Sequence, residues 1–140
     1  MRIGEGKDYI KLEPLSRGGK SDPRRDFEFR IKVRLGDFHG TRDGVWFDDE
    51  ELRRFTRALE ELERTRSGSV TLSAMSDDEF RFTLRSIDRV GHFEIEVALR
   101  DSRFVGETCY PTRLTGVIPF SAEYFLALVR DFRKLFKNFP

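Results

Sequence analysis

The imidazole and thiol side chains that could serve as general base and nucleophile are few in this sequence. It contains two histidines, His39 and His92, and one cysteine, Cys109. The three are far apart along the chain, and none lies in a local motif typical of a catalytic nucleophile. We expect His92 on the exposed side of a strand and Cys109 in a loop before Pro111. The sequence therefore gives no support for a Cys–His catalytic site.

Metal and cofactor motifs are also weak. Two histidines without an i,i+4 spacing and one cysteine do not form a typical zinc site, and residues 77–79 (DDE) run directly into a strand, unlike a calcium loop. Glu94 and Glu96 share one strand face, as paired carboxylates of some hydrolases do, but cross-strand pairing with Arg81 and Arg85 explains them more simply. The glycines match no nucleotide-binding pattern. We expect no metal, no cofactor and no enzymatic activity.

The charge balance argues against nucleic acid as a partner. The 26 basic and 25 acidic residues leave a formal net charge of +1, which gives no long-range attraction to polyanions or anionic membranes. A stripe of basic side chains predicted on one sheet face is interrupted by glutamates, and no exposed aromatic residues are evident beside it. The basic residues are Arg30, Lys32, Arg34, Arg81 and Arg85, and the glutamates are Glu28, Glu94 and Glu96.

Alternation of apolar and polar residues at period two predicts the strands. It is clearest in DFEFRIKVRL, residues 26–35, which should bury one side and expose the other. Residues 16–26 are predicted to form a mobile loop, and residues 36–44 a turn or bulged connection. The other predicted strands are residues 9–14, 44–47, 69–74, 80–87, 92–100 and 113–120.

Two amphipathic segments predict helices at residues 48–66 and 121–139. Asp48 or Asp49 can cap the first helix, and Ser121 can cap the second. In the hairpin of residues 80–100, three cross-strand pairs support one register. They are Phe82 with Val97, Leu84 with Ile95, and Arg85 with Glu94.

These elements predict an α+β fold in a single domain, residues 1–140. The predicted order is β-β-β-α-β-β-β-α, and one further strand can be added before the last helix. This order favours a mainly antiparallel sheet of about six strands. The apolar stripes of both helices need a surface, so we place both helices on one face of the sheet and leave the opposite face open. The start of the chain, MRIGEGKDYI, is too polar for a signal peptide, and no segment is long and apolar enough to span a membrane. We expect a cytoplasmic protein.

The layout resembles the small bacterial immunity proteins of the WapI type. The resemblance runs from about Tyr9 to Phe139 and includes YIKLEPL, GVWFDDEELRRFTRALEEL and GHFEIEVAL. Residues 16–26 and 101–112 have no counterpart in it. The resemblance implies a non-enzymatic antitoxin that binds the toxic domain of a contact-delivered bacterial effector. It offers no toxin-contacting motif to carry over.

A protein partner is therefore expected at the open, mixed-charge sheet face, with the acidic start of the first helix as a second candidate. The helix cluster can also be explained by helix capping alone, and the sheet face by solvation alone. Two other hypotheses remain: a homodimer that covers the open face, and a small-ligand site that involves His39, His92 or Cys109. The expected contact residues are Glu28, Arg30, Lys32, Arg34, Arg81, Arg85, Glu94 and Glu96 on the sheet, and Asp48, Asp49, Glu50 and Glu51 on the helix.

Overall fold

The strands form two antiparallel sheets of four strands each, so the expectation of one sheet of about six strands is wrong. A computed structural model describes residues 1–76 and 78–139. The N-terminal sheet has the order β1 (Arg2–Glu5), β2 (Asp8–Arg17), β3 (Phe27–Leu35) and β4 (Phe38–Phe47). The C-terminal sheet has the order β5 (Ser69–Ser73), β6 (Phe80–Ser86), β7 (His92–Val105) and β8 (Thr108–Ser121). The α+β class is confirmed.

The error has a physical reason. Alternation shows which side chains of a strand are buried, but it does not show which strand lies beside it. The helix α1 (Asp49–Thr65) follows β4, and the chain then begins a separate sheet. Part of the predicted connection at residues 36–44 is strand, because the turn is complete at Gly36 and Asp37 and β4 begins at Phe38.

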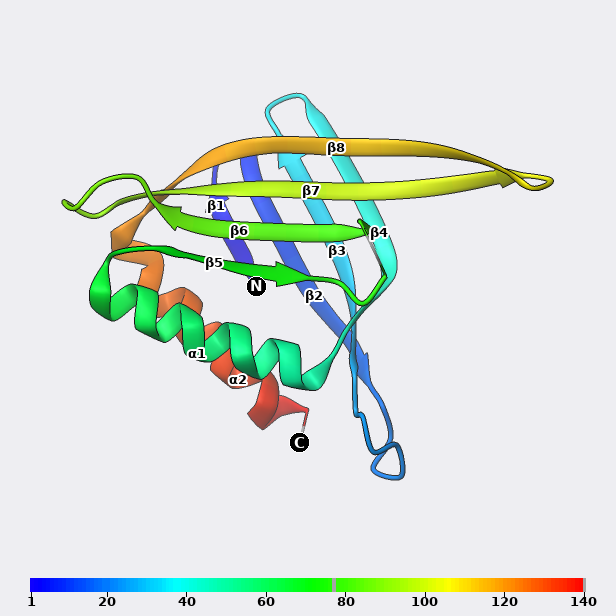
Figure 1. Cartoon of the computed structure of the whole chain (residues 1–140), viewed down its shortest axis with the longest axis horizontal. Coiled ribbons are helices and arrows are strands. Elements are labelled where there is room, and N and C mark those ends of the chain that lie inside the picture. The colour runs from blue at the N-terminus through cyan, green and yellow to red at the C-terminus, as the bar shows by residue number, and fades with distance from the viewer. Residues whose placement is uncertain (77, 140) are drawn as a thin grey trace.

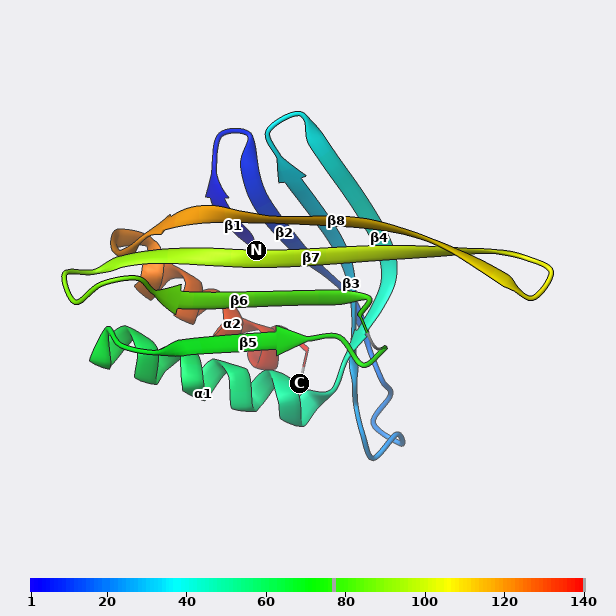
Figure 2. The same cartoon turned by 45° about the horizontal axis from the view of Figure 1, so that its top comes forward.

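The two sheets lie one behind the other with their strands crossing, and their apolar sides face each other (Figures 1 and 2). One close approach between them is near the β3–β4 turn. There Leu35 lies against Gly116 of β8, where an added Cβ would be only 2.6 Å from Leu35 Cδ1. Each sheet therefore has its own exposed outer side.

Both helices pack along one flank of the two sheets, with α1 beside β5 (Figures 1 and 2). They contact the inner sides of both sheets, not one face of a single sheet. The Phe55 ring of α1 lies 5.6 Å from Phe82 of β6 and 5.0 Å from Phe132 of α2 (Phe125–Asn138). The Phe136 ring of α2 lies 5.7 Å from Phe27 of β3. The helices thus complete one core shared by both sheets.

The predicted helix caps have different outcomes. The Asp48 side chain accepts a hydrogen bond from the Glu51 N–H and caps α1, as predicted. The prediction for Ser121 is wrong. Its side chain makes no capping hydrogen bond, and a 3₁₀ turn, η1 (Ala122–Tyr124), precedes α2.

The predicted register of the β6–β7 hairpin is confirmed. Phe82 pairs with Val97, Leu84 with Ile95, and Arg85 with Glu94. Apolar and ionic pairs favour the same alignment, because a slip by one residue would move the apolar side chains to the outer side and the charged side chains to the core.

The β7–β8 hairpin is longer than predicted. β7 continues to Val105 and β8 begins at Thr108, with Gly106 at a φ of 62° in the turn. Cys109, which was expected in a loop, therefore lies in β8 opposite Phe104. None of these added residues is buried, so alternating burial could not reveal them in the sequence.

We predict that Phe47 is essential for stability because its ring joins the two sheets. It lies 5.4 Å from Phe29 of the N-terminal sheet and 6.0 Å from Phe80 of the C-terminal sheet, and it is 1% exposed. Phe47→Ala should lower the free energy of unfolding by about 3–5 kcal/mol, as for other buried phenylalanines. Urea unfolding measures this loss. Phe38→Ala, at a residue that is 73% exposed, is the matched control and should change stability by less than about 0.5 kcal/mol. Equal effects of the two substitutions would contradict the prediction.

Candidate functional site

The twelve charged residues predicted to bind a partner lie on three separate surfaces. β3 and β6 belong to different sheets, so Arg81 and Arg85 do not extend the stripe formed by Arg30, Lys32 and Arg34. The outer side of the N-terminal sheet carries Glu28, Arg30, Lys32 and Arg34; the outer side of the C-terminal sheet carries Arg81, Arg85, Glu94 and Glu96; and the start of α1 carries Asp48, Asp49, Glu50 and Glu51. The structure does not bring the three groups together.

The acidic start of α1 is largely engaged within the protein. Asp48 caps the helix, and Glu51 accepts two hydrogen bonds from Arg54. Asp49 binds Arg53 and also Arg17, whose side chain is only 7% exposed. Burial is the main cause that lowers the pKa of Arg17, and the Asp49 carboxylate opposes this effect. The stability of α1 therefore explains most of this cluster.

On the N-terminal sheet, three of the four predicted residues also have internal partners. Glu28 accepts a hydrogen bond from Ser16 Oγ at 2.7 Å. Arg30 makes a bidentate pair with Asp43, and its hydrogen bond is the main cause that lowers the pKa of the Asp43 carboxyl group. The Arg34 side chain donates to the Gly36 carbonyl. Like charges nevertheless meet on this face.

Three cations form a row across this sheet. Arg2 of β1 lies opposite Lys11 of β2, and Lys11 lies opposite Lys32 of β3. Like charges directly opposite on neighbouring strands are destabilising. Glu13 binds Lys11 at 2.7 Å and partly compensates. The row leaves this part of the outer face positive.

On the C-terminal sheet, Arg85 is held between two carboxylates. Its Nε binds Glu94 at 2.7 Å and its Nη2 binds Glu96 at 2.6 Å. These hydrogen bonds are the main cause that raises the pKa of Arg85. Arg81 does not share these carboxylates, and Asp78 lies 3.8 Å from its guanidinium. The expected cross-strand pairing thus holds for Arg85 but not for Arg81.

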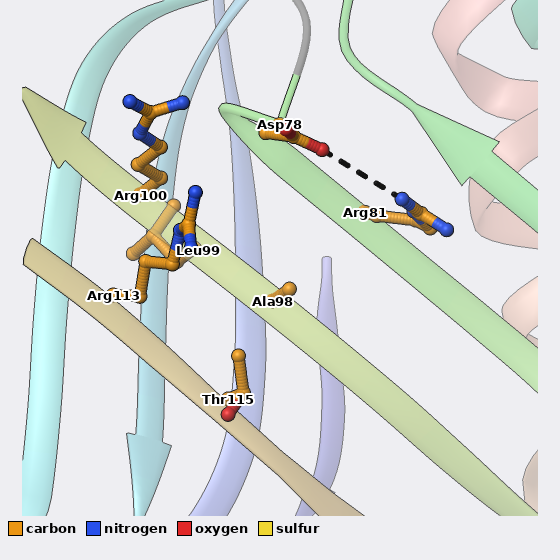
Figure 3. Close-up of a pocket in the computed structure, with 7 residues that line it drawn as sticks. All are labelled: Asp78, Arg81, Ala98, Leu99, Arg100, Arg113 and Thr115. Carbon is orange, nitrogen blue, oxygen red and sulfur yellow. Dashed lines mark ion pairs between the residues drawn. The ribbon is translucent and has the colours of Figure 1, made fainter. Parts of the chain in front are cut away.

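Beside Arg81 the outer side of this sheet is hollowed, and we call this feature the arginine hollow (Figure 3). It has a volume of about 200 Å³. The small side chain of Ala98 lies between Arg81 of β6 and Thr115 of β8, to which it is paired. The lining residues are Asp78, Arg81, Ala98, Leu99, Arg100, Arg113 and Thr115.

The arginine hollow concentrates positive charge. Arg100 and Arg113 lie directly opposite each other on β7 and β8. Arg81 contributes a third guanidinium on the other side of Ala98, where it is directed at Asp78. Among the described residues, Nε of Arg100 is buried without a hydrogen-bond partner. Guanidinium groups bind carboxylates and other oxyanions in bidentate geometry. The arrangement can therefore receive an acidic group from a partner.

The sequence analysis did not assign Arg100, Arg113, Asp78 or Thr115 to a contact site. Recognising the Arg100–Arg113 pair requires the register of β7 and β8. The sequence signal for this register is the short turn at Gly106 and Glu107. Arg100 lies as many residues before the turn as Arg113 lies after it, so a tight hairpin pairs them. A glycine in a two-residue connection is typical of tight hairpins.

The residues considered for catalysis lie elsewhere. His92 Nδ1 is hydrogen-bonded to Asp88, and this bond is the main cause that lowers the pKa of Asp88. Within residues 1–76 and 78–139, no three His, Cys, Asp or Glu side chains are grouped so as to hold a metal ion. Neither helix in this part of the chain is long and apolar enough to cross a membrane.

A small groove near η1 is the clearest candidate for the small-ligand alternative. Phe120, Tyr124 and Leu128 line it, and its volume is about 190 Å³, below the roughly 300 Å³ at which ligand pockets usually begin. The interaction of the Tyr124 hydroxyl with the Glu5 carboxylate is the main cause that raises the pKa of Tyr124 to about 12. His39, His92 and Cys109 are not among the residues that line this groove.

The chain, an α+β domain with these charged outer faces, was compared with known protein families, curated proteins and solved structures. The chain matches the immunity protein WapI-like family over residues 1–140 and belongs to it. No curated protein and no solved structure matches the chain significantly.

We predict that the arginine hollow reduces stability. Arg113→Gln removes the like charge opposite Arg100 and should raise the free energy of unfolding by about 0.2–1 kcal/mol. Urea unfolding at low ionic strength measures the gain. The gain should shrink at about 1 M salt, where the Debye length is about 3 Å. A loss of stability in Arg113→Gln would show that this arginine is structural.

Proposed function

We propose that this protein is a bacterial immunity protein that neutralises a cognate toxin domain by direct binding in the cytoplasm. Membership of the immunity protein WapI-like family over the whole chain is the observation that carries the proposal. Neutralisation by binding needs a complementary surface but no reaction at the immunity protein itself. The antitoxin acts by covering the toxin domain, without a cofactor.

The outer side of the C-terminal sheet is the proposed contact surface. Arg81, Arg100 and Arg113 supply three cations around a hollow whose lining includes one carboxylate among the described residues, that of Asp78. Arg is enriched at protein interfaces, and an acidic toxin surface would offset the repulsion between Arg100 and Arg113. The neighbouring Arg85–Glu94–Glu96 cluster adds a fixed charge pattern that can distinguish among toxins.

The outer side of the N-terminal sheet is the second proposed contact surface. Lys32 lies in the row of cations, and Arg34 is next to it on the same side of β3. Glu28 and Arg30 are already engaged by Ser16 and Asp43, so they are expected to contribute less. The acidic start of α1 is the weakest of the three surfaces, because its carboxylates stabilise the helix.

Charge reversal on the two sheets distinguishes these surfaces. The probe is the purified C-terminal domain of the large effector that the proposal expects a gene beside this one to encode, titrated by calorimetry at low salt. Arg81→Glu with Arg113→Glu should weaken binding by about tenfold or more, since it places like charges against an acidic surface. The matched control, Arg30→Glu with Arg34→Glu, makes the same change in net charge on the other sheet.

Each result has a defined meaning. Weaker binding only in the Arg81 and Arg113 variant supports the C-terminal sheet. Weaker binding only in the Arg30 and Arg34 variant would show that the toxin contacts the N-terminal sheet instead. If the unmodified protein fails to bind the toxin domain, and co-expression fails to relieve toxicity, direct neutralisation of that toxin is disproved.

A further inference from the structure

The end of the β7–β8 hairpin projects beyond the rest of the molecule (Figures 1 and 2). β6 pairs with β7 only as far as Phe80 opposite Leu99. β7 and β8 remain paired to Val105 opposite Thr108. Residues 100–113 therefore form a two-stranded extension, which we call the β7–β8 arm.

The tip of the arm exposes large apolar side chains. Phe104 is 68% exposed, Val105 70% and Tyr110 53%. Most other phenylalanines of the chain, such as Phe80 and Phe93 in the same sheet, are buried in the core. Two-stranded hairpins are at best marginally stable alone in water, and an apolar tip adds nothing to folding while it stays in water. The stability of the free protein does not explain this tip.

The base of the arm is fixed to the body of the molecule. Arg42 of β4 reaches across to the C-terminal sheet, where it binds Asp101 at 2.5 Å and Glu79 at 2.9 Å. The Arg100 N–H also donates to the Glu79 carbonyl at 2.8 Å. The arm is thus held in one direction before any partner binds, which lowers the entropy lost on association.

The distribution of side chains at the tip indicates the shape of its partner. Phe104 lies opposite Cys109 on the side that carries Arg100 and Arg113, whereas Tyr110 lies opposite Arg103 on the other side. Both sides of the ribbon therefore present an aromatic ring. A flat surface would cover only one of these rings, but a cleft would cover both.

The charges of the arm indicate the chemistry of that cleft. Arg100, Arg103 and Arg113 bring three cations, whereas Asp101 is already bound to Arg42 and leaves Glu107 as the other acid of the arm. A complementary cleft is apolar inside and has carboxylates at its rim. Aromatic residues and arginine are the residue types that most often dominate binding energy at interfaces.

We infer that the β7–β8 arm is the main toxin-docking element and inserts its tip into an apolar, acid-rimmed cleft of the toxin domain. The inference builds on the proposed neutralising function. It also makes the arginine hollow and the arm one continuous contact, because Arg100 and Arg113 belong to both. A second copy is the competing occupant. Its groove beside Phe120 contains Glu5 and Asp131, but the groove is small, at about 190 Å³.

The test replaces Phe104 and Tyr110 with serine in the full-length protein. Both residues are exposed, so the unfolding midpoint should be unchanged. The affinity for the purified toxin domain encoded by the adjacent gene should fall by about tenfold or more. Phe38→Ser is the matched control: Phe38 is an exposed phenylalanine beside the β3–β4 turn, outside the arm, and its loss should leave affinity unchanged.

Hydrogen exchange gives a readout that does not depend on the substitutions. Backbone amides of residues 102–110 should exchange faster than those of β6 in the free protein, and they should become protected in the complex. Light scattering of the same samples reports whether the free protein is a monomer or a dimer.

The outcomes separate the inference from the function on which it depends. If the unmodified protein binds the toxin domain and the Phe104 and Tyr110 variant binds equally well, the inference is wrong but neutralisation stands. If the free protein is a dimer that this variant dissociates while toxin binding is kept, the occupant is a second copy and the inference is overturned. If the unmodified protein does not bind the toxin domain, the proposed function and the inference fail together.

Discussion

Burial of phenylalanine between the two sheets is the constraint on which the rest of the structure depends. The Phe47 ring contacts Phe29 in its own sheet and Phe80 in the other sheet. The Phe55 ring of α1 contacts Phe82 of β6 and Phe132 of α2, which joins both helices to this core. Each strand in this core turns one side inward, so its charged residues must lie on the outside. The apolar core thus creates two charged outer faces on opposite sides of the protein.

Most of the charge on these faces is balanced within the protein. Arg85 is held by Glu94 and Glu96, and Arg30 is held by Asp43. Exposed ion pairs of this kind add little stability, but they keep side chains in place. Excess positive charge remains in two places, the arginine hollow and the row of Arg2, Lys11 and Lys32, where like charges lie opposite each other. Like charges directly opposite each other on neighbouring strands are expected to reduce the stability of the free protein, and such a cost is typical of a surface used for binding.

The sequence predicted most of the local structure but not the strand partners. Alternation identified the buried side of β3, and paired residues such as Leu84 and Ile95 fixed the β6–β7 register, because burial imposes both. It could not show that β4 and β5 belong to different sheets, since either arrangement buries the same side chains. The β7–β8 arm was missed for the opposite reason. Its residues are mostly exposed on both sides, so Arg103 to Thr112 show no alternating burial. The candidate site depends on this hairpin, and its arginines were therefore only partly identified.

β8 is an edge strand of 14 residues, and its free side could pair with strands of other molecules. Pro111 and Pro119 both lie in this strand, opposite Ser102 and Glu94. Proline has no backbone N–H. In an antiparallel pair it leaves the hydrogen bonds to β7 intact only if its nitrogen faces the free edge of β8. The two positions are an even number of residues apart, so both interrupt the same edge. The protein can therefore present a long, partly apolar ribbon to water with protection against polymerisation through strand addition.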